Sequence, residues 1–161
     1  IVFACKNFGG VEHRIEFVRE LNGIKFYNDS CATVPEAAAA AVNAFEKPVI
    51  LITGGTDKKL DFTSLAPELK KAKALFLLAG TGTDKLTPLL RAQHTPFFGP
   101  YPNLASLLHA VECEIDGAAQ ETVVFSPGAT SFGMFKNEFD RGNCFKEAVR
   151  SCWPQGKALA N

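Results

Sequence analysis

Residues 48–55 read PVILITGG, a continuous apolar run of strand length that ends in two glycines. A run without polar alternation is typical of a strand covered on both faces, as in a parallel sheet. A second such run, Ala74 to Ala79, ends in GTG at residues 80–82, and a third, Thr122 to Phe125, ends at Ser126. These three runs predict the core of an α/β fold.

Helices are predicted between the strands. They are expected at Glu36 to Phe45, Phe62 to Lys71, Thr83 to Ala92 and Leu104 to Ile115, with helical turns from Ser131 to about Cys152 and a short strand at Thr95 to Phe98. Pro35 suits a first helical turn, and Thr33 is placed to cap it. Strands alternating with helices predict a Rossmann-like, mostly parallel sheet with helices on both faces.

The beginning of the chain has a different pattern. Val11 to Glu20 alternates loosely between polar and apolar residues, and Ile24 to Asn28 is a second strand. Asn22-Gly23 lies between them, and Asn-Gly is a strong hairpin signal. We therefore expect an N-terminal antiparallel hairpin.

Composition narrows the functional classes. The 161 residues fit one domain, and 17 basic residues balance 17 acidic ones. A zero net charge argues against nucleic acid or an anionic membrane as the main partner. The apolar runs are too short to span a bilayer. The five cysteines are scattered without a C-x-x-C pair, which favours reduced thiols in a cytoplasmic protein.

The chain starts at Ile1 inside an apolar segment. We interpret residues 1–8 as the remnant of a preceding domain, residues 9–153 as one domain and residues 154–161 as a tail. A processed or renumbered single-domain protein is the alternative.

Two loops carry small hydroxyl residues where a strand is followed by a helix: YNDSCATVP at residues 27–35 and SPGATSFGMFKN at residues 126–137. Ligands bind at this edge of open α/β sheets. Ser131 lies near a predicted helix start, where free N–H groups suit a carboxylate or a phosphate. The alternative is simple N-capping by Ser131.

Other candidates have plain structural alternatives. Lys58, after Gly54-Gly55, is suited to a phosphate or carboxylate. An ordinary turn with a solvated lysine is the interpretation that this motif alone favours, and no Walker loop is present. The GTG at residues 80–82 is only a partial dinucleotide fingerprint, and a turn with a helix cap is the structural alternative. His13-Arg14 is either an anion-binding pair or an exposed pair on a strand edge. Arg141 either clamps the final helix to the site or forms a surface ion pair.

Together these motifs resemble the C-terminal domain of the Mur ligases from about Phe8 to about Val149. The motifs are GVEHRIE (10–16), NDS (28–30) with Ala32-Thr33 and Pro35, GG (54–55) with Lys58 and DF (61–62), SPGA (126–129) with SF (131–132) and MFKN (134–137), and RG (141–142). Within that family the chain is most similar to members that add D-glutamate to UDP-N-acetylmuramoyl-L-alanine in peptidoglycan synthesis.

The resemblance implies an ATP-dependent amide ligase that works through an acyl phosphate. ATP and Mg²⁺ would be bound mostly by a missing central domain, so this fragment is expected to be inactive alone and to hold no catalytic residue and no metal. Arg14 would contact the ATP phosphates, and Asp29 would contact the ribose. Thr33, Lys58 and Ser131, with backbone N–H groups near Phe132 and Glu138, would hold the two carboxylates of D-glutamate.

Two departures from the family pattern concern specificity. Some members have a lysine at the position of Cys31 and an aromatic residue at the position of Glu138. The Cys31 thiol lies before a predicted helix, whose dipole could lower its pKa, although a packed residue is the simpler interpretation. The other partners expected from the resemblance are the missing N-terminal and central domains, in a monomer. A self-standing nucleotide-binding or transferase domain and a non-enzymatic interaction module are the alternatives.

Overall fold

The computed structural model describes residues 10–115 and 120–153. The elements run in the order β1 (Glu16–Leu21), β2 (Ile24–Asn28), α2 (Pro35–Asn43), β3 (Ile50–Thr53), α3 (Leu65–Leu69), β4 (Ala74–Leu78), α4 (Thr81–Ala92), β5 (Phe98–Tyr101), α5 (Leu104–Glu114), β6 (Glu121–Phe125) and α6 (Glu138–Cys152). The expected remnant at residues 1–8 and tail at residues 154–161 lie outside the described residues.

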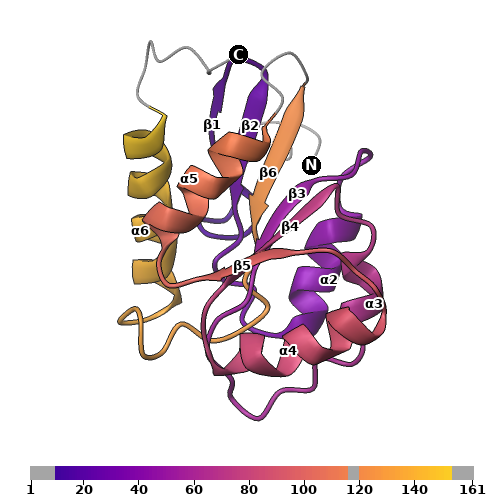
Figure 1. The fold of residues 1–161 in the computed structure, drawn as a ribbon. Coiled ribbons are helices and arrows are strands. Elements are labelled where there is room, and N and C mark those ends of the chain that lie inside the picture. Colours follow the sequence, from indigo (N-terminus) through magenta and orange to yellow (C-terminus); the bar gives the residue numbers. More distant parts are fainter. Residues whose placement is uncertain (1–9, 116–119, 154–161) are drawn as a thin grey trace, which may run out of the picture.

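The sheet has six strands in the order β1-β2-β6-β3-β4-β5 (Figure 1). Strands β1 and β2 pair antiparallel, and the pairs β2–β6, β6–β3, β3–β4 and β4–β5 are parallel. The α/β prediction, with an N-terminal hairpin on a mostly parallel sheet, is confirmed.

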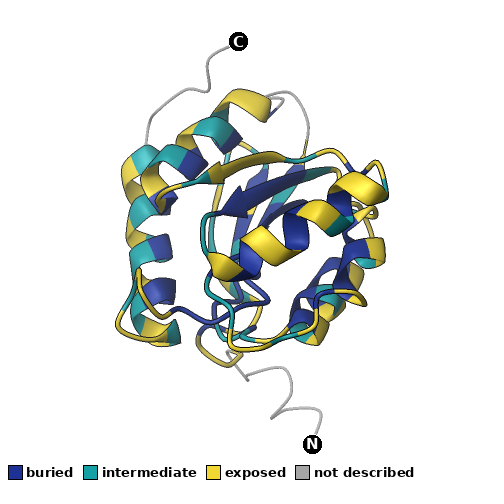
Figure 2. Cartoon of the chain, turned by 60° about the horizontal axis from the view of Figure 1, so that its bottom comes forward, coloured by how far each residue is buried: buried dark blue, intermediate teal, exposed yellow. Residues whose placement is uncertain are grey.

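Helices cover both faces of the sheet (Figure 1). Helices α5 and α6 pack on one face, where Ile50 and Ile52 of β3 belong to the same buried cluster. Helices α2, α3 and α4 pack on the other face, where Leu51 belongs to a second cluster. The alternation along β3 follows from the two-residue period of a strand, and all three side chains are buried. Figure 2 shows the strands inside the molecule coloured as buried.

Three predicted boundaries are wrong for local reasons. The first strand begins at Glu16, because residues 11–15 bend back through a bridge between Val11 and Arg14. Helix α2 begins at Pro35 with Val34 as its N-cap residue and without a side-chain cap, so Thr33 is not the cap. Strand β5 runs over Phe98–Tyr101 and not over residues 95–98. The backbone N–H of Thr95 still donates to Leu90 at the end of α4.

The last helix also begins later than predicted. Helix α6 starts at Glu138, and the side chain of Asn137 caps it by accepting a hydrogen bond from the Asp140 N–H. Ser131 therefore lies in a loop and does not cap a helix. Among the described residues, no helix is long and apolar enough to cross a membrane.

Candidate functional site

The candidate site lies at the carboxyl-terminal edge of β2, β6 and β3. Strands β3 and β6 are neighbours, but α3 follows β3 onto one face of the sheet and α6 follows β6 onto the other. A crevice between loops that diverge in this way is the usual ligand position in open α/β sheets. The topology therefore places the candidate site between residues 54–61 and residues 126–137.

Backbone hydrogen bonds join these two loops. The N–H of Thr56 donates to the carbonyl of Thr130 over 3.1 Å, and the N–H of Thr130 returns a bond of 3.0 Å. Closer to the sheet, the N–H of Gly54 and the hydroxyl of Thr53 both donate to the Pro127 carbonyl, over 2.8 and 2.9 Å. The two loops consequently form one paired surface.

Close packing requires glycine both in the turn after β3, at residues 54–55, and in the turn after β4, at residues 80–82. A Cβ on Gly80, at φ +153°, would lie 2.3 Å from the Gly55 carbonyl oxygen. A Cβ on Gly54, at φ +101°, would lie 2.4 Å from the Thr83 hydroxyl. Positive φ and such distances exclude other residues. The GTG turn is thus a tight turn that begins α4, in agreement with the structural alternative.

Lys58 lies beside Phe132 on this surface. Its Nζ is 6.0 Å from the centroid of the Phe132 ring, which is cation–π range. Lys58 is exposed and forms no ion pair with a described residue. Ser131, next to Phe132, is only 4% exposed, whereas Phe132 is 54% exposed. The structure thus gathers a cation without an ion-pair partner among the described residues, a hydroxyl and an exposed aromatic ring.

Leucine in place of Phe132 is expected to weaken binding of the anionic ligand proposed below by about three- to fivefold. The cation–π contact is worth about 0.5–1 kcal/mol at an exposed site, and its loss releases the lysine side chain to more rotamers. Phe132→Tyr, which keeps the aromatic face, is the matched control. Equal affinity in the leucine and tyrosine variants, measured by calorimetry in the complete protein, would contradict this role.

The loop after β2 holds Asp29 in a protected position. Asp29 is 6% exposed. One carboxylate oxygen accepts a 2.7 Å bond from the Ser126 hydroxyl, and the other accepts a 3.2 Å bond from the Ile15 N–H. Burial raises the pKa of the Asp29 carboxyl, against the opposing effects of these two donors and of the Arg14 charge. Arg14 is exposed and lies within electrostatic range of Asp29.

Arg141 is the buried link between the loops and the last helix. It is fully buried, and its Nε and Nη2 donate to the hydroxyl and carbonyl of Ser30 over 3.0 and 2.8 Å. Its Nη1 donates to the Ala129 carbonyl over 2.9 Å. Burial lowers the pKa of the guanidinium to about 10, which leaves it charged at neutral pH. The clamp interpretation is confirmed, and the surface ion pair is wrong.

His13 is buried, which the strand-edge interpretation did not predict. It is 2% exposed at φ 61°, and its Nδ1 lies 2.8 Å from Nδ2 of Asn28. A Cβ on Gly142 would lie 2.1 Å from this nitrogen, so α6 can approach only through glycine. The buried partners Asn28 and Ser30 were missed as well. Their signal was the run of small polar residues directly after a buried strand.

Thr33 and Cys31 complete the β2 loop. Both are half-buried, and the neighbouring Ala32 carbonyl accepts a 2.9 Å bond from the Gly128 N–H. Burial raises the pKa of the Cys31 thiol, so the idea of a thiol activated by a helix dipole is wrong. Glu138 begins α6, and its carbonyl accepts a 2.7 Å bond from the Ser30 hydroxyl. The Glu138 backbone therefore belongs to the same hydrogen-bond network as Ser30 and Arg141.

Sequence comparison agrees with this geometry. The protein-family model for the glutamate ligase domain of Mur ligases matches residues 13–129. The chain belongs to the Mur ligase family. The predicted resemblance is thereby confirmed for most of the described domain.

Two curated relatives of this Mur ligase domain are enzymes named UDP-N-acetylmuramoylalanine–D-glutamate ligase. The one from Treponema pallidum is 49% identical over 147 residues, and the one from Roseiflexus sp. is 44% identical over 151 residues. The matches cover 91% and 92% of this chain but only 27% and 32% of those enzymes. The chain thus spans about a third of the length of the curated relatives it matches.

A solved structure shares the fold of this Mur ligase domain. UDP-N-acetylmuramate–alanine ligase from Thermotoga maritima aligns with a TM-score of 0.63 at 14% identity, over 94% of this chain and 33% of that one. At that identity the likeness supports the fold alone.

Proposed function

We propose that this chain is the C-terminal, amino-acid-binding domain of an ATP-dependent ligase that adds D-glutamate to UDP-N-acetylmuramoyl-L-alanine in bacterial peptidoglycan synthesis. The observation that carries the proposal is the juxtaposition of Lys58, Ser131 and Phe132 at the switch point of the sheet. The names of the relatives supply the substrates. In this proposal the protein is a cytoplasmic monomer.

D-glutamate has two carboxylates, and the site offers donors for both. Lys58 supplies a cation without an ion-pair partner among the described residues, and Ser131 and Thr33 supply hydroxyl groups. The backbone N–H of Phe132 adds a donor in the same loop. Charge-assisted hydrogen bonds to carboxylates are the stronger class in proteins. We assign these four residues to D-glutamate on this ground.

ATP would bind on the other side of the loop that follows β2. Arg14 is exposed and suited to phosphate oxygens, and the Asp29 carboxylate is fixed by Ser126 and Ile15. In the described part of the chain, one group could hold a metal ion, Glu12 with His13 and Glu16. Lys146 already binds both carboxylates of that group, over 2.8 and 3.2 Å. Mg²⁺ would therefore be held by the rest of the ligase.

The contribution of this domain to the reaction would be positioning. The amine of D-glutamate must face the acyl phosphate made from the alanine carboxylate and ATP. Holding both carboxylates fixes the direction of the amine, and such orientation lowers the barrier without a general base from this chain. The paired loops keep the donors in place during the attack. The isolated domain is expected to have no ligase activity.

The proposal is tested in the complete protein by ADP release with UDP-N-acetylmuramoyl-L-alanine. Release driven by D-glutamate, but not by L-glutamate, L-lysine or diaminopimelate, is expected. Release driven by another amino acid would keep the ligase class and overturn the substrate. Tight ATP binding by the 161-residue chain alone would favour a self-standing nucleotide-binding domain, although the turn glycines are accounted for by packing.

Asp29→Asn is expected to stabilise the fold at neutral pH while reducing activity. The pKa of Asp29 is raised in the folded state, so its contribution to stability is greatest below the unfolded pKa and is lost as pH rises through the folded pKa. The asparagine variant should therefore melt above the wild type at pH 7.5, by an amount that disappears in acid. Each 1 kcal/mol would appear as about 2–4 °C in Tm.

The measurement is a pair of melting curves at several pH values, with Asp61→Asn as the control at an exposed carboxyl whose pKa is lowered. A variant that melts below the wild type at pH 7.5 would show that the hydrogen bonds from Ser126 and Ile15 outweigh the burial of the charge.

A further inference from the structure

A second cavity lies at the opposite edge of the sheet from the candidate ligase site. Ile50, Ala74 and Phe98 are the first residues of β3, β4 and β5, and all three line it. These strands are parallel, so their first residues lie at the edge away from the Lys58 loop. The cavity volume is about 400 Å³. Volumes of about 300–1,000 Å³ are typical of small-molecule sites.

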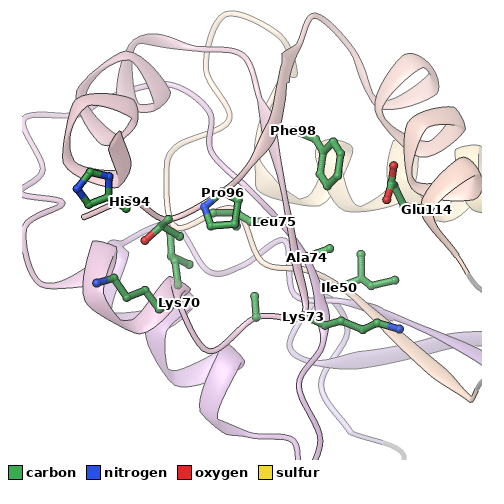
Figure 3. Close-up of a pocket in the computed structure, with 12 residues that line it drawn as sticks. Ile50, Lys70, Lys73, Ala74, Leu75, His94, Pro96, Phe98 and Glu114 are labelled. Atoms are coloured by element: carbon green, nitrogen blue, oxygen red, sulfur yellow. The ribbon is translucent and has the colours of Figure 1, made fainter. Parts of the chain in front are cut away.

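Apolar side chains form the middle of this cavity. Figure 3 shows Leu75 next to Pro96, with Ala74 and Ile50 below Phe98. Phe98 stacks on Phe76 at a centroid distance of 4.7 Å and an interplanar angle of 15°. It is also 37% exposed. A planar ring in the cavity can therefore add to an aromatic stack that already exists, which is a favourable offset-stacked arrangement.

The polar groups are unevenly distributed around the apolar middle. Figure 3 shows Lys70 and His94 on the side away from Phe98 and Glu114. Lys70 forms no ion pair with another described residue, whereas Lys73 is paired with Glu121. A neighbouring hollow of about 460 Å³ shares Lys70, Ala72 and Lys73 with this cavity. It adds Lys47, and also Lys71, which is paired with Glu68. The side near Lys70 thus has an excess of positive charge.

Thr95 contributes an unused hydroxyl to the same wall. The residue is 6% exposed, and its Oγ1 has no hydrogen-bond partner in the described structure. A buried hydroxyl without a partner is costly, and such groups normally find one in protein, water or ligand. A ligand oxygen at this wall of the cavity would supply the missing partner.

We propose that this cavity is a binding site for a small planar aromatic carboxylate. The ring lies over Leu75 and against Phe98, and the carboxylate lies toward Lys70, His94 and the Thr95 hydroxyl. The site is separate from the proposed ligase chemistry and does not depend on it. An apolar middle with a few convergent polar groups is the usual make-up of a small-molecule pocket.

The test is an NMR titration of the ¹⁵N-labelled 161-residue chain with 2-naphthoate. Saturable amide shifts confined to residues 70–75 and 94–98 are expected. Lys70→Met should weaken binding about five- to tenfold, since a charge-assisted bond is lost. Lys136→Met, which removes an exposed lysine at the opposite edge, is the matched control and should leave the affinity unchanged. Neutral 2-naphthylmethanol should bind about as weakly as 2-naphthoate binds Lys70→Met.

Two further variants separate the ring site from the charge site. Ala74→Leu, which fills the cavity between Ile50 and Phe98, should abolish the shifts, and its own spectrum shows whether it folds. If it does not fold, Pro96→Ala, which removes part of the wall, should weaken binding and serves in its place. Shifts that centre on residues 126–132, or equal affinity of the wild type for 2-naphthoate and 2-naphthylmethanol, would overturn the proposal.

Discussion

Lys58→Ala is expected to raise the KM for D-glutamate by about 10- to 100-fold in the complete ligase, with little change in the KM for ATP. Hydrogen bonds to charged groups contribute about 1.5–3 kcal/mol, and each 1.4 kcal/mol is about tenfold in affinity. The effect should be specific, because Lys58 is exposed and has no ion-pair partner among the described residues whose loss would disturb the fold. Steady-state kinetics with each substrate varied in turn measures both constants.

The neighbouring lysine provides the control for this change. Lys59 is also exposed, follows Lys58 in the same turn and carries the same charge. Lys59→Ala should leave the KM for D-glutamate within about twofold of the wild type. An unchanged KM in Lys58→Ala would remove Lys58 from the proposed site. Full activity after joint replacement of Lys58 and Ser131 would favour a bare interaction module.

Arg141→Ala is expected to lower the free energy of unfolding by about 2–6 kcal/mol, because two buried carbonyls lose their donors at about 1–3 kcal/mol each. The change removes the largest polar side chain that is fully buried in the described part of the chain, and it leaves the carbonyls of Ala129 and Ser30 without their donors. An unpaired buried carbonyl costs about 1–3 kcal/mol. Chemical denaturation of the 161-residue chain measures the loss.

Two variants complete this experiment. Arg141→Lys should recover only part of the stability, because an ammonium cannot reproduce the forked geometry that reaches both Ser30 and Ala129. Arg150→Ala removes an exposed arginine from the same helix and should change stability by less than about 0.5 kcal/mol. A loss below 1 kcal/mol in Arg141→Ala would show that the loops are held mainly by their own backbone pairing.

Much of the architecture could be predicted from local patterns. The apolar runs at β3, β4 and β6 and the Asn-Gly turn specify buried strands and a hairpin through their own side chains. Three boundary errors have local causes, whereas the late start of α6 follows a segment that is held to a distant one. Residues 131–137 come directly after Thr130, which pairs with Thr56 across 74 positions, and α6 begins only after the Asn137 cap. Sequence spacing contains no information on such pairing.

The residue types of the candidate site could be predicted from the sequence, but the contacts that connect its loops to α6 could not. Small hydroxyl residues after buried strands marked both loops, and the charge of Arg14 lies within electrostatic range of Asp29. The burial of His13 and Arg141 was not predictable, because both are polar residues in polar stretches. Each becomes buried only when α6 docks, through Gly142 in one case and through Ser30 in the other.

The burial of the charged Arg141 side chain has a consequence for how ligand binding should respond to ionic strength. The guanidinium is charged and fully buried, and neutral groups satisfy it, since no described carboxylate forms an ion pair with it. Its field reaches the loop of Ser131 through protein, where mobile ions cannot enter, whereas exposed charges such as Lys58 are screened within about 10 Å at 0.1 M salt. Attraction of an anion to this edge should therefore fall with added salt only to a plateau.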